Sequence, residues 1–481
     1  MTTDRGGLAG RSGTDRDVDV AVVGGGVLGT AIAARVAATT ASVCLLEDET
    51  DVAEGASKGN AGVAVAYYGP PGTDEAGLIA ASYPGWEELT SRLSVPYRRL
   101  GAVMVALDEE QAATLEHTRD EVRACGARAE LLTPAQARDQ EPLITTRCVA
   151  GLSMPDEGVI DPMALTVAYA QLAAANGAVI RLGSPVTAIE TDETGRSILT
   201  TPARIRARFV VNAAGVAAGR LSRLAGGEEL RYWPRKGQYA VLDRAFASSL
   251  TRIVFSTHSA TTKGINVVPT THGSALLGPT ALDQDDADDK ATDRDTVDRL
   301  IVSAATLVPG ISREHVIKFF AANRPASDEQ HRLRFDTKVR NLLHCTNRSA
   351  GVSISPAAAH RVLELLREAG LDAPERAGAV NVLPAAPRLR AAADPAGLIR
   401  QDPQYGQVVC ACEHVSAAEI NRALAGPVPA TSIDGVRKRT GATYGRCQGS
   451  LCSAGIAFLT ALGTGTGPGT VRQTARGTVG S

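Results

Sequence analysis

VDVAVVGGGVLGTAIAARV, residues 18–36, decides the fold class of this chain. Its first six residues predict a buried β-strand, because valine is β-branched and favours extended backbone. Gly24, Gly26 and Gly29 follow in GxGxxG spacing, and the Ala-rich stretch after them predicts a helix. A second short strand is predicted over 42–46. The order strand, glycine turn, helix and strand predicts a Rossmann-like unit that binds a dinucleotide.

Each glycine of the turn has its own task. The first permits the tight turn, the second lets a pyrophosphate approach the backbone, and the third lets helix and strand pack closely. The helix N-terminus adds free N–H groups and a positive dipole end. Glu47 lies roughly 20 residues beyond Gly29, where a carboxylate accepts ribose hydroxyls. A bare GxGxxG turn also occurs without a ligand, and the motif does not separate NAD from FAD.

Two later segments are rich in small residues. EGASKGNAG, residues 54–62, is small and polar, so it can lie along a long cofactor and donate backbone N–H groups. VVNAAG, residues 210–215, predicts a strand that enters a small-residue turn. Each segment taken singly is more often an ordinary tight turn.

The composition excludes several classes of protein. The 481 residues are 44% hydrophobic and 21% charged, which is ordinary globular usage. Lys and Arg number 50 against 52 Asp and Glu, and this balance argues against a nucleic-acid partner. The most membrane-like stretch, 20–34, is shorter than the roughly 20 residues that a span needs, so we expect no direct membrane span. No targeting segment is visible, and we expect a cytoplasmic protein.

Four of the eight cysteines crowd into the last quarter of the chain. Cys410 and Cys412 form a CxC pair, and Cys447 and Cys452 form a CxxxxC pair after a gap of 34 residues. Without a secretion signal, this pattern points to metal or redox chemistry rather than to disulfides. Zinc sites favour C-x₂₋₄-C pairs and fit poorly, whereas four thiolates suit a [2Fe–2S] cluster. Zinc and metal-free thiols are the alternatives. The other cysteines are expected to be packing residues: Cys44, Cys125, Cys148 and Cys345.

Beyond single motifs, the chain resembles the FAD-dependent oxidoreductases of the D-amino-acid-oxidase superfamily. The likeness is closest to the glycerol-3-phosphate dehydrogenase and L-2-hydroxyglutarate oxidase branch. It is carried, in family order, by the glycine turn with Glu47 and by segments 56–62, 156–162, 212–215, 235–239, 263–264, 269–273, 277–280, 324–325 and 349–356. The resemblance implies an FAD cofactor, with segment 351–356 returning to the flavin ring. The predicted cofactor-binding residues are Gly24, Gly26, Gly29, Glu47, Ser57, Asn60, Gly62, Ala214, Gly215, Gly351, Val352 and Ser353.

The surroundings of the late cysteines, CACE at 410–413 and GRCQGSLC at 445–452, resemble the bacterioferritin-associated-ferredoxin-like [2Fe–2S] domain. That domain ends anaerobic-type glycerol-3-phosphate dehydrogenases and some opine and hydroxyproline dehydrogenase subunits. The resemblance implies that the four cysteines bind a [2Fe–2S] cluster.

The predicted fold class is α/β (α+β). A Rossmann-like FAD-binding domain carries an inserted substrate domain with an antiparallel sheet, and a small helical [2Fe–2S] domain follows. The predicted bounds are 1–17 for a disordered tail, 18–84, 142–225 and 321–370 for the FAD-binding domain, 85–141 and 226–320 for the substrate domain, 371–405 for a linker, 406–462 for the [2Fe–2S] domain and 463–481 for a second disordered tail.

The resemblance also suggests substrate-binding residues. Arg324 occupies a family position that commonly clamps a substrate carboxylate or phosphate, which suits a planar guanidinium. Its alternative role is a surface ion pair. Lys263 could add positive charge to the site, and Tyr239 could form part of the pocket wall or simply pack.

One departure from the family concerns the catalytic base. The relatives often carry a histidine five residues after the equivalent of Asn60, where this chain has Val65. An alcohol needs a base for its hydroxyl proton as hydride leaves, whereas a neutral amine does not. His258 and His272 are the candidate replacements, and each is otherwise a structural histidine.

These observations together predict an FAD-dependent dehydrogenase. A flavin accepts two electrons as a hydride from a CH–OH or CH–NH carbon of a small anionic substrate, and a [2Fe–2S] cluster passes them on singly. The electron acceptor would be a redox partner protein or a second subunit. The alternative is an electron-transfer subunit of a heteromeric flavoprotein complex without substrate oxidation of its own. A zinc-bearing NAD enzyme is a third interpretation.

Overall fold

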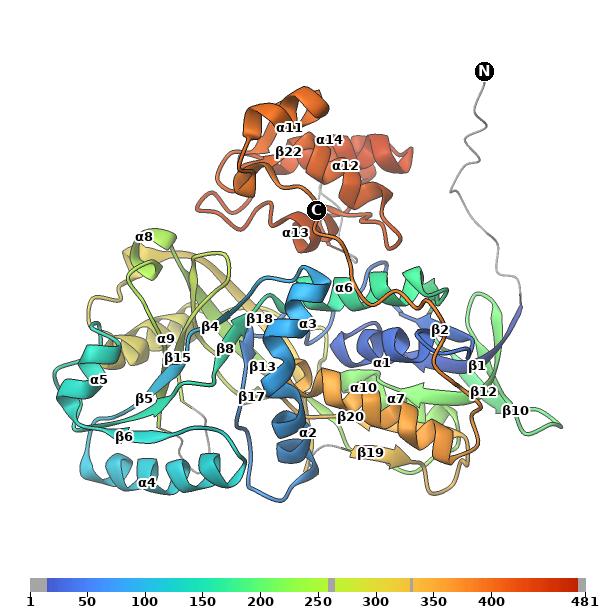
Figure 1. Ribbon diagram of the computed structural model, residues 1–481, viewed down its shortest axis with the longest axis horizontal. Coiled ribbons are helices and arrows are strands. Elements are labelled where there is room, and N and C mark those ends of the chain that lie inside the picture. Colours follow the sequence, from blue (N-terminus) through green and yellow to red (C-terminus); the bar gives the residue numbers. More distant parts are fainter. Residues whose placement is uncertain (1–14, 258–263, 329–331, 475–481) are drawn as a thin grey trace.

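The protein is described by a computed structural model, which covers residues 15–257, 264–328 and 332–474. Figure 1 shows two sheet-based parts side by side, with a small and mainly helical part above them. The chain passes back and forth between the two sheets, so each sheet combines segments that are far apart in sequence.

The first sheet is built around β1, whose neighbours β12 and β2 both run parallel to it. Residues 20–23 of β1 are all buried, which is typical of a strand in the middle of a parallel sheet. The strand order is β10-β11-β12-β1-β2-β9, and β20 pairs with both β12 and β19. The bounds are β1 (Arg16–Val23), β2 (Val43–Leu46), β9 (Val179–Arg181), β10 (Ala188–Thr191), β11 (Ser197–Thr200), β12 (Arg204–Asn212), β19 (Arg332–Phe335) and β20 (Leu342–Thr346).

Three helices pack together with this sheet in one apolar cluster (Figure 1). Helix α1 supplies the crossover between β1 and β2, and it is buried on almost every side because its residues are small or apolar. The carboxylate of Asp161 caps the start of α6 by accepting from the N–H groups of Met163 and Ala164. The bounds are α1 (Val27–Ala37), α6 (Pro162–Ala175), α10 (Gly351–Glu368) and, after β12, α7 (Ala218–Leu224).

The second sheet has nine strands in the order β17-β13-β16-β15-β14-β5-β7-β6, with β18 on the other side of β13. All its pairs are antiparallel except β14 with β5. The strands are β5 (Ala102–Ala106), β6 (Glu130–Leu132), β7 (Ala150–Met154), β13 (Trp233–Leu242), β14 (Ile253–Ser256), β15 (Asn266–Pro269), β16 (Ala275–Gly278), β17 (Leu282–Asp283) and β18 (Val316–Ala326). Its helices are α4 (Glu109–Ala124), α5 (Pro134–Gln140), α8 (Arg244–Ala247) and α9 (Arg294–Leu307).

A three-stranded sheet, β3-β8-β4, lies where the chain passes between the two large parts. It consists of β3 (Val63–Ala64), β4 (Tyr97–Arg99) and β8 (Gly158–Ile160), and the helices α2 (Asp74–Ser82) and α3 (Trp86–Leu93) separate β3 from β4. The C-terminal part has its own apolar cluster. Its elements are α11 (Pro395–Gln401), β21 (Val408–Cys410), β22 (Val415–Ser416), α12 (Ala417–Ala425), α13 (Ile433–Thr440) and α14 (Ser453–Thr464).

This architecture confirms the predicted fold class: a parallel core sheet, a largely antiparallel second sheet and a small helical end. Within the three described ranges, no helix has both the length and the apolar character to cross a membrane.

Two predicted boundaries differ from the structure. Strand β7 belongs to the second sheet, because it pairs with β5, whereas the sequence places 142–225 in the first domain. The linker 371–405 packs on the first domain: Leu371 is buried, and Asn176 exchanges two hydrogen bonds with Val380.

The predicted C-terminal tail, 463–481, also differs from the structure in its described residues. Helix α14 continues to Thr464, and Val471 is 3% exposed within the last apolar cluster. Likewise Arg16 and Asp17 extend β1 rather than belonging to the first tail. Glycine-rich sequence gives no periodicity, so a single buried valine that fixes such a segment is not visible in the sequence.

Candidate functional site

The predicted dinucleotide residues meet at one edge of the first sheet. Val23 at the end of β1 pairs with Asn212 of β12 and with Leu46 of β2, so three parallel strands end side by side. Their carboxyl ends lead directly into the glycine turn, into Ala214-Gly215 and into Glu47. This edge is where ligands bind in open parallel sheets.

The glycine turn is packed too closely for any side chain. A Cβ at Gly29 would lie 1.9 Å from the carbonyl oxygen of Gly24, and one at Gly24 would lie 2.4 Å from that of Ala213. Gly24 also has φ +115°, a conformation that L side chains rarely adopt. The turn therefore brings the start of α1 against β1 and β12, as a dinucleotide site requires.

The N-terminus of α1 is prepared for an anion. Gly26 precedes the helix without a capping side chain, and the first turn contains no acidic residue. The first N–H group, that of Val27, donates to the hydroxyl of Ser57 at 2.9 Å. Ser57 thus ties the 54–62 loop to the point where the helix dipole favours a phosphate.

Glu47 is placed to accept hydrogen bonds. Its carboxylate accepts from the N–H groups of Gly25 at 2.5 Å and Glu49 at 2.9 Å. Burial raises the pKa of the Glu47 carboxyl to about 7. A buried acceptor beside the glycine turn fits the ribose of a dinucleotide.

A second helix N-terminus opens beside the first. Gly351 at the start of α10 would place a Cβ 3.6 Å from the side chain of Val27. The Ser353 hydroxyl accepts from the N–H of Val65 at 3.0 Å, while Val352 is buried in the apolar cluster around α1. In the loop between them, the Asn60 side chain accepts from the N–H of Gly62 at 2.7 Å. The predicted residues of 54–62 and 351–353 therefore lie near both helix ends, where one elongated cofactor could contact them together.

The substrate side lies on one face of the β13–β18 ribbon. Arg324 pairs with Arg235, and four residues along, Phe320 pairs with Tyr239. Alternate residues of paired strands share a face, so all four side chains lie on the same side as Ala322. A Cβ at Gly59 would lie 1.8 Å from the Cβ of Ala322, so the 54–62 loop covers that face. Arg324 and Tyr239 thus face the loop that is predicted to hold the cofactor.

Arg324 is half-buried and has no carboxylate within ion-pair distance among the residues that the structure describes. Its guanidinium donates to the carbonyl of Arg348 at 3.3 Å. Burial lowers the pKa of the Arg324 guanidinium. Tyr68 raises this pKa and Arg235 lowers it further, but burial is the largest effect. Arg235 itself pairs with Asp283 at 2.5 Å. A partly desolvated guanidinium of this kind suits an anionic substrate.

Tyr239 forms the wall beside this guanidinium. Its ring stacks on Phe320 with centroids 4.8 Å apart, and burial raises the pKa of its hydroxyl to about 12. Tyr239 therefore stays neutral and packs the site rather than acting as a base at neutral pH.

His272, one of the two candidate bases, lies away from Arg324 and Tyr239 along β13. It lies in the turn after β15, and its Nε2 is 2.7 Å from Asp161 Oδ2. Its ring stacks on Tyr444 of the C-terminal part, with centroids 4.4 Å apart. The turn between β15 and β16 lies next to the end of β13, where Ala275 pairs with Leu242. Leu242 is seven residues, or roughly 23 Å of extended strand, from Arg235. His258 and Lys263 lie outside the described residues.

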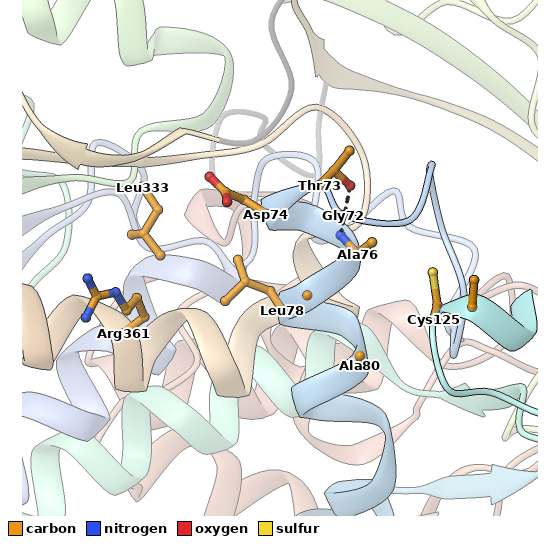
Figure 2. A pocket seen from close by; sticks show the side chains of 11 residues that line it. Gly72, Thr73, Asp74, Ala76, Leu78, Ala80, Cys125, Leu333 and Arg361 are labelled. Atoms are coloured by element: carbon orange, nitrogen blue, oxygen red, sulfur yellow. Dashed lines mark hydrogen bonds between the residues drawn. The ribbon is translucent and has the colours of Figure 1, made fainter. Parts of the chain in front are cut away.

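The pocket in Figure 2 is separate from these residues. It lies between α2, the end of α4, β19 and α10, and no predicted site residue lines it. Its one arginine, Arg361, is already paired with Glu364 and Glu368.

The four late cysteines lie together as two pairs. The Cys410 thiol hydrogen-bonds with that of Cys452, and the Cys412 thiol with that of Cys447. Among the described residues, the only three ligand atoms within 4.8 Å of one another belong to a different group, so no three of these sulfurs surround one point. A single tetrahedral zinc would bring all four together at Zn–S distances of about 2.3 Å. Two pairs instead fit two irons, each with two thiolates.

Backbone donors surround these sulfurs. N–H groups of Thr443 and Glu413 point at Cys410, and the hydrogen bond from Cys452, the largest effect, lowers the pKa of the Cys410 thiol to about 6. A Cβ at Gly445 would lie 2.2 Å from that of Cys412, so the two ligand loops pack directly on each other. Backbone N–H donors of this kind stabilise the thiolates that iron requires.

The domain that carries the cysteines is joined to the first domain by buried ion pairs. Lys438 on α13 is fully buried and binds the carboxylates of Asp51 and Glu54. Arg439 pairs with Asp51 at 2.8 Å, and Lys58 pairs with Asp434. Burial raises the pKa of Asp51, but Arg439 and then Lys438 more than offset it, so the pKa lies below its usual value. Sequence reasoning missed this interface; the run RKR at 437–439 was the available signal.

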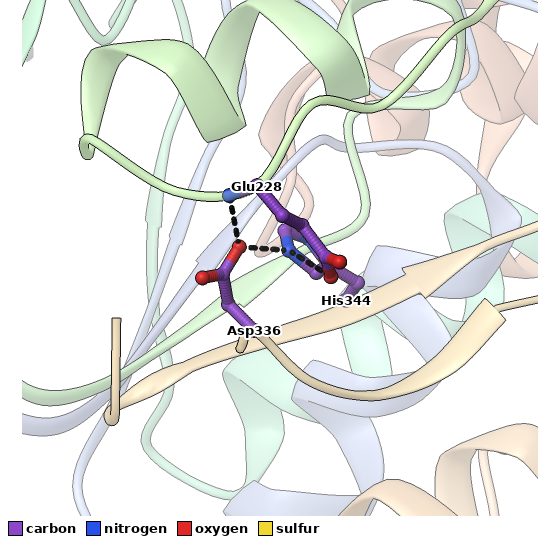
Figure 3. A group of neighbouring side chains, drawn as sticks. All are labelled: Glu228, Asp336 and His344. Carbon is purple, nitrogen blue, oxygen red and sulfur yellow. Dashed lines mark hydrogen bonds and ion pairs between the residues drawn. The ribbon is translucent and has the colours of Figure 1, made fainter. Parts of the chain in front are cut away.

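Sequence reasoning also missed the buried group in Figure 3. His344 Nε2 is 3.0 Å from Asp336 Oδ2 and 3.8 Å from Glu228 Oε1, while its Nδ1 meets the amide of Asn212. Glu228 also pairs with Arg334 at 2.9 Å. Asp336 also accepts from the N–H groups of Glu228 and Lys338, so the group is a hydrogen-bonded support for the end of β12, where the cofactor turn begins.

Comparisons with known proteins agree with this geometry. Residues 19–365 match the model of the family "FAD dependent oxidoreductase" (DAO), and residues 408–459 match the "BFD-like [2Fe-2S] binding domain". The chain is 28% identical over 441 residues to "Glycerol 3-phosphate dehydrogenase" of Caloramator mitchellensis, covering 90% of this chain and 92% of that one. It is 26% identical to one subunit of the anaerobic glycerol-3-phosphate dehydrogenase of Escherichia coli K12, covering 92% and 87%. The solved L-alpha-glycerophosphate oxidase of Mycoplasma pneumoniae shares the fold, with a TM-score of 0.73 at 24% identity over 77% of this chain and 100% of that one.

Proposed function

Because this chain belongs to the family of FAD-dependent oxidoreductases and carries a BFD-like [2Fe–2S] domain, we propose that it is a dehydrogenase of a small phosphorylated alcohol of the glycerol 3-phosphate type. Its electrons leave singly through the C-terminal domain to a protein acceptor. The relatives named glycerol-3-phosphate dehydrogenase support the substrate class. The Escherichia coli relative is named as one subunit of its enzyme, which supports a protein partner for this chain.

The observation that carries this proposal is the position of Arg324. Its guanidinium faces the 54–62 loop, and no described carboxylate neutralises it. A phosphate dianion accepts a bidentate pair of hydrogen bonds from such a group. Arg235 lies beside it on the neighbouring strand and is already paired with Asp283, so Arg324 is the guanidinium left for the anion. Bound in this way, the substrate would present its C–H bond towards the loop.

The bound flavin supplies a two-electron acceptor for hydride. The chain supplies the remaining functions: Arg324 orients the anion, while the stacked Tyr239 and Phe320 limit access of water from one side. The base that takes the hydroxyl proton is assigned to His258 or Lys263, because His272 lies away from Arg324 along β13. After hydride loss, the electrons pass to the domain of the four cysteines.

One observation favours a second substrate class. Val65 stands where relatives often have histidine, and its side chain cannot take a proton. An amine needs no such base, and the chain is 30% identical over 319 residues to "Glycine oxidase" of Geobacillus kaustophilus. Amino and imino acids are therefore the competing substrates.

Anaerobic flavin bleaching separates the two classes. Glycerol 3-phosphate, 2-hydroxyglutarate, glycine and proline are mixed in turn with the protein, and absorbance of the oxidised flavin is followed. We expect bleaching by glycerol 3-phosphate, and a loss of roughly 100- to 1,000-fold in kcat/KM for Arg324→Met with partial rescue in Arg324→Lys. Bleaching by an amine alone, or an unaffected Arg324→Met variant, contradicts the proposal.

A further inference from the structure

The C-terminal domain presents an apolar face to solvent. Leu451 is 77% exposed, Phe458 54% and Leu462 66%. Phe458 and Leu462 are four residues apart and share one side of α14, and Leu451 lies in the turn just before that helix. The other side of α14 is buried in the domain core through Ile456 and Ala457. Three large apolar side chains that are exposed on and just before one helix mark an interaction surface.

This face begins at the predicted cluster. Leu451 lies between Cys447 and Cys452 in the chain, and Cys452 immediately precedes α14. A protein seated on Leu451 and Phe458 would therefore lie directly over one loop of cluster ligands. Electron transfer requires a short distance between donor and acceptor. A face beside the cluster ligands therefore suits a partner that accepts electrons.

Charge identifies the partner further. Between residues 406 and 474 the acidic side chains Glu413, Glu419 and Asp434 are all buried. The exposed charged residues of the same segment are Arg422, Arg472 and Arg446, and Arg446 pairs with Asp243. In a symmetric dimer, two copies of this domain would bring their exposed arginines together, and the like charges would repel each other. An acidic protein meets it favourably.

We propose that the face formed by Leu451, Phe458 and Leu462 docks a separate electron-accepting protein with an apolar centre and an acidic surround. This inference rests on the proposed function, since it names the acceptor of the same electrons. Each one-electron acceptor takes one electron from the reduced protein, so two acceptor molecules reoxidise one reduced flavin. Contacts of this transient class are small and depend on ionic strength.

The test uses the holoprotein reduced by light with a deazaflavin, so that no substrate is needed. Its reoxidation is followed by stopped flow with succinylated cytochrome c as the acidic acceptor, native cytochrome c as the basic one, and ferricyanide as a small one. The double variant Phe458→Gln, Leu462→Gln is compared with the wild type. Val302→Gln on α9, a residue 67% exposed on another domain, is the matched control.

We expect the double variant to reduce succinylated cytochrome c at least tenfold more slowly, with ferricyanide and the Val302→Gln control unchanged. The wild-type rate with the acidic acceptor should exceed that with native cytochrome c and fall with added salt. Equal rates for wild type and double variant overturn the proposal, as does reduction of neither cytochrome. A wild-type dimer that the double variant converts to monomers identifies a second copy instead. A substrate screen without bleaching would refute the proposed function but leave this result standing.

Discussion

The body of the molecule and the attachment of its C-terminal domain are held by different physics. The core around β1 and α1 is apolar, and Val20, Val22 and Ile32 are fully buried. The C-terminal domain is attached by a small apolar cluster, in which Val428 joins Val52 and Val167, and by buried charges, with Lys438 bound to Asp51. Apolar burial tolerates small changes, whereas a buried ion pair fails when one partner is removed. The fold is therefore robust, and the placement of the cluster domain beside the cofactor loop depends on a few charges.

The largest expected effect comes from Lys438→Met. It removes one of two cations from Asp51 and one of two from Glu54, which keeps only Lys58, so both buried carboxylates are undercompensated and the docked arrangement is destabilised by about 3–5 kcal/mol. We expect a separate early unfolding transition of the C-terminal domain in urea. The exposed pair of Arg400 with Asp394 is the control, where Arg400→Met should change stability by less than about 1 kcal/mol. A single unchanged transition in Lys438→Met would refute the role of the ion pairs.

Gly29→Ala tests the apolar side of the comparison. A Cβ there meets the Gly24 carbonyl at 1.9 Å, so the turn must shift, at about 3 kcal/mol. We expect the purified variant to lose its yellow colour while the cluster absorbance remains. Gly55→Ala has no atom within 4 Å of the new methyl group and should keep FAD. Full flavin content in Gly29→Ala would contradict the close approach.

Glu47→Gln gives a pH-dependent effect on the flavin-free protein. The folded pKa of about 7 exceeds the ordinary 4.5, so the folded state holds more protons than the unfolded state between these values. Stability is therefore lost as pH rises from about 4.5 to 7, by about 3 kcal/mol. Glu47→Gln should remove that loss, as measured by urea unfolding at pH 5 and pH 8. Parallel pH profiles for both proteins would show that Glu47 is not buried in this way.

The smallest effect concerns exposed charges. Arg361 pairs with Glu364 and Glu368 at the surface of α10. Arg361→Gln should lower stability by less than about 0.5 kcal/mol, and 1 M salt should abolish the difference. The effect of Lys438→Met should persist at that salt concentration, because buried pairs are screened much less. Equal salt sensitivity of the two variants would remove the distinction between the regions.

Sequence reasoning succeeded where the signal is local. The valine run, the glycine turn and Glu47 lie within 30 residues and specify one βαβ unit, and the resemblance extended this to the cofactors. It failed for contacts between distant segments. Nothing in the sequence around His272 indicates that it pairs with Asp161 and stacks on Tyr444. The ion pairs of Lys438 join residues more than 380 positions apart, which no periodicity reveals.

The most direct measurement of the central claim is an anaerobic freeze-quench experiment on the complete protein with glycerol 3-phosphate. The account predicts that flavin absorbance bleaches and that the EPR signal of a reduced [2Fe–2S] cluster then appears in the same sample. Bleached flavin with a cluster that stays oxidised, and rapid reoxidation by oxygen alone, would contradict it.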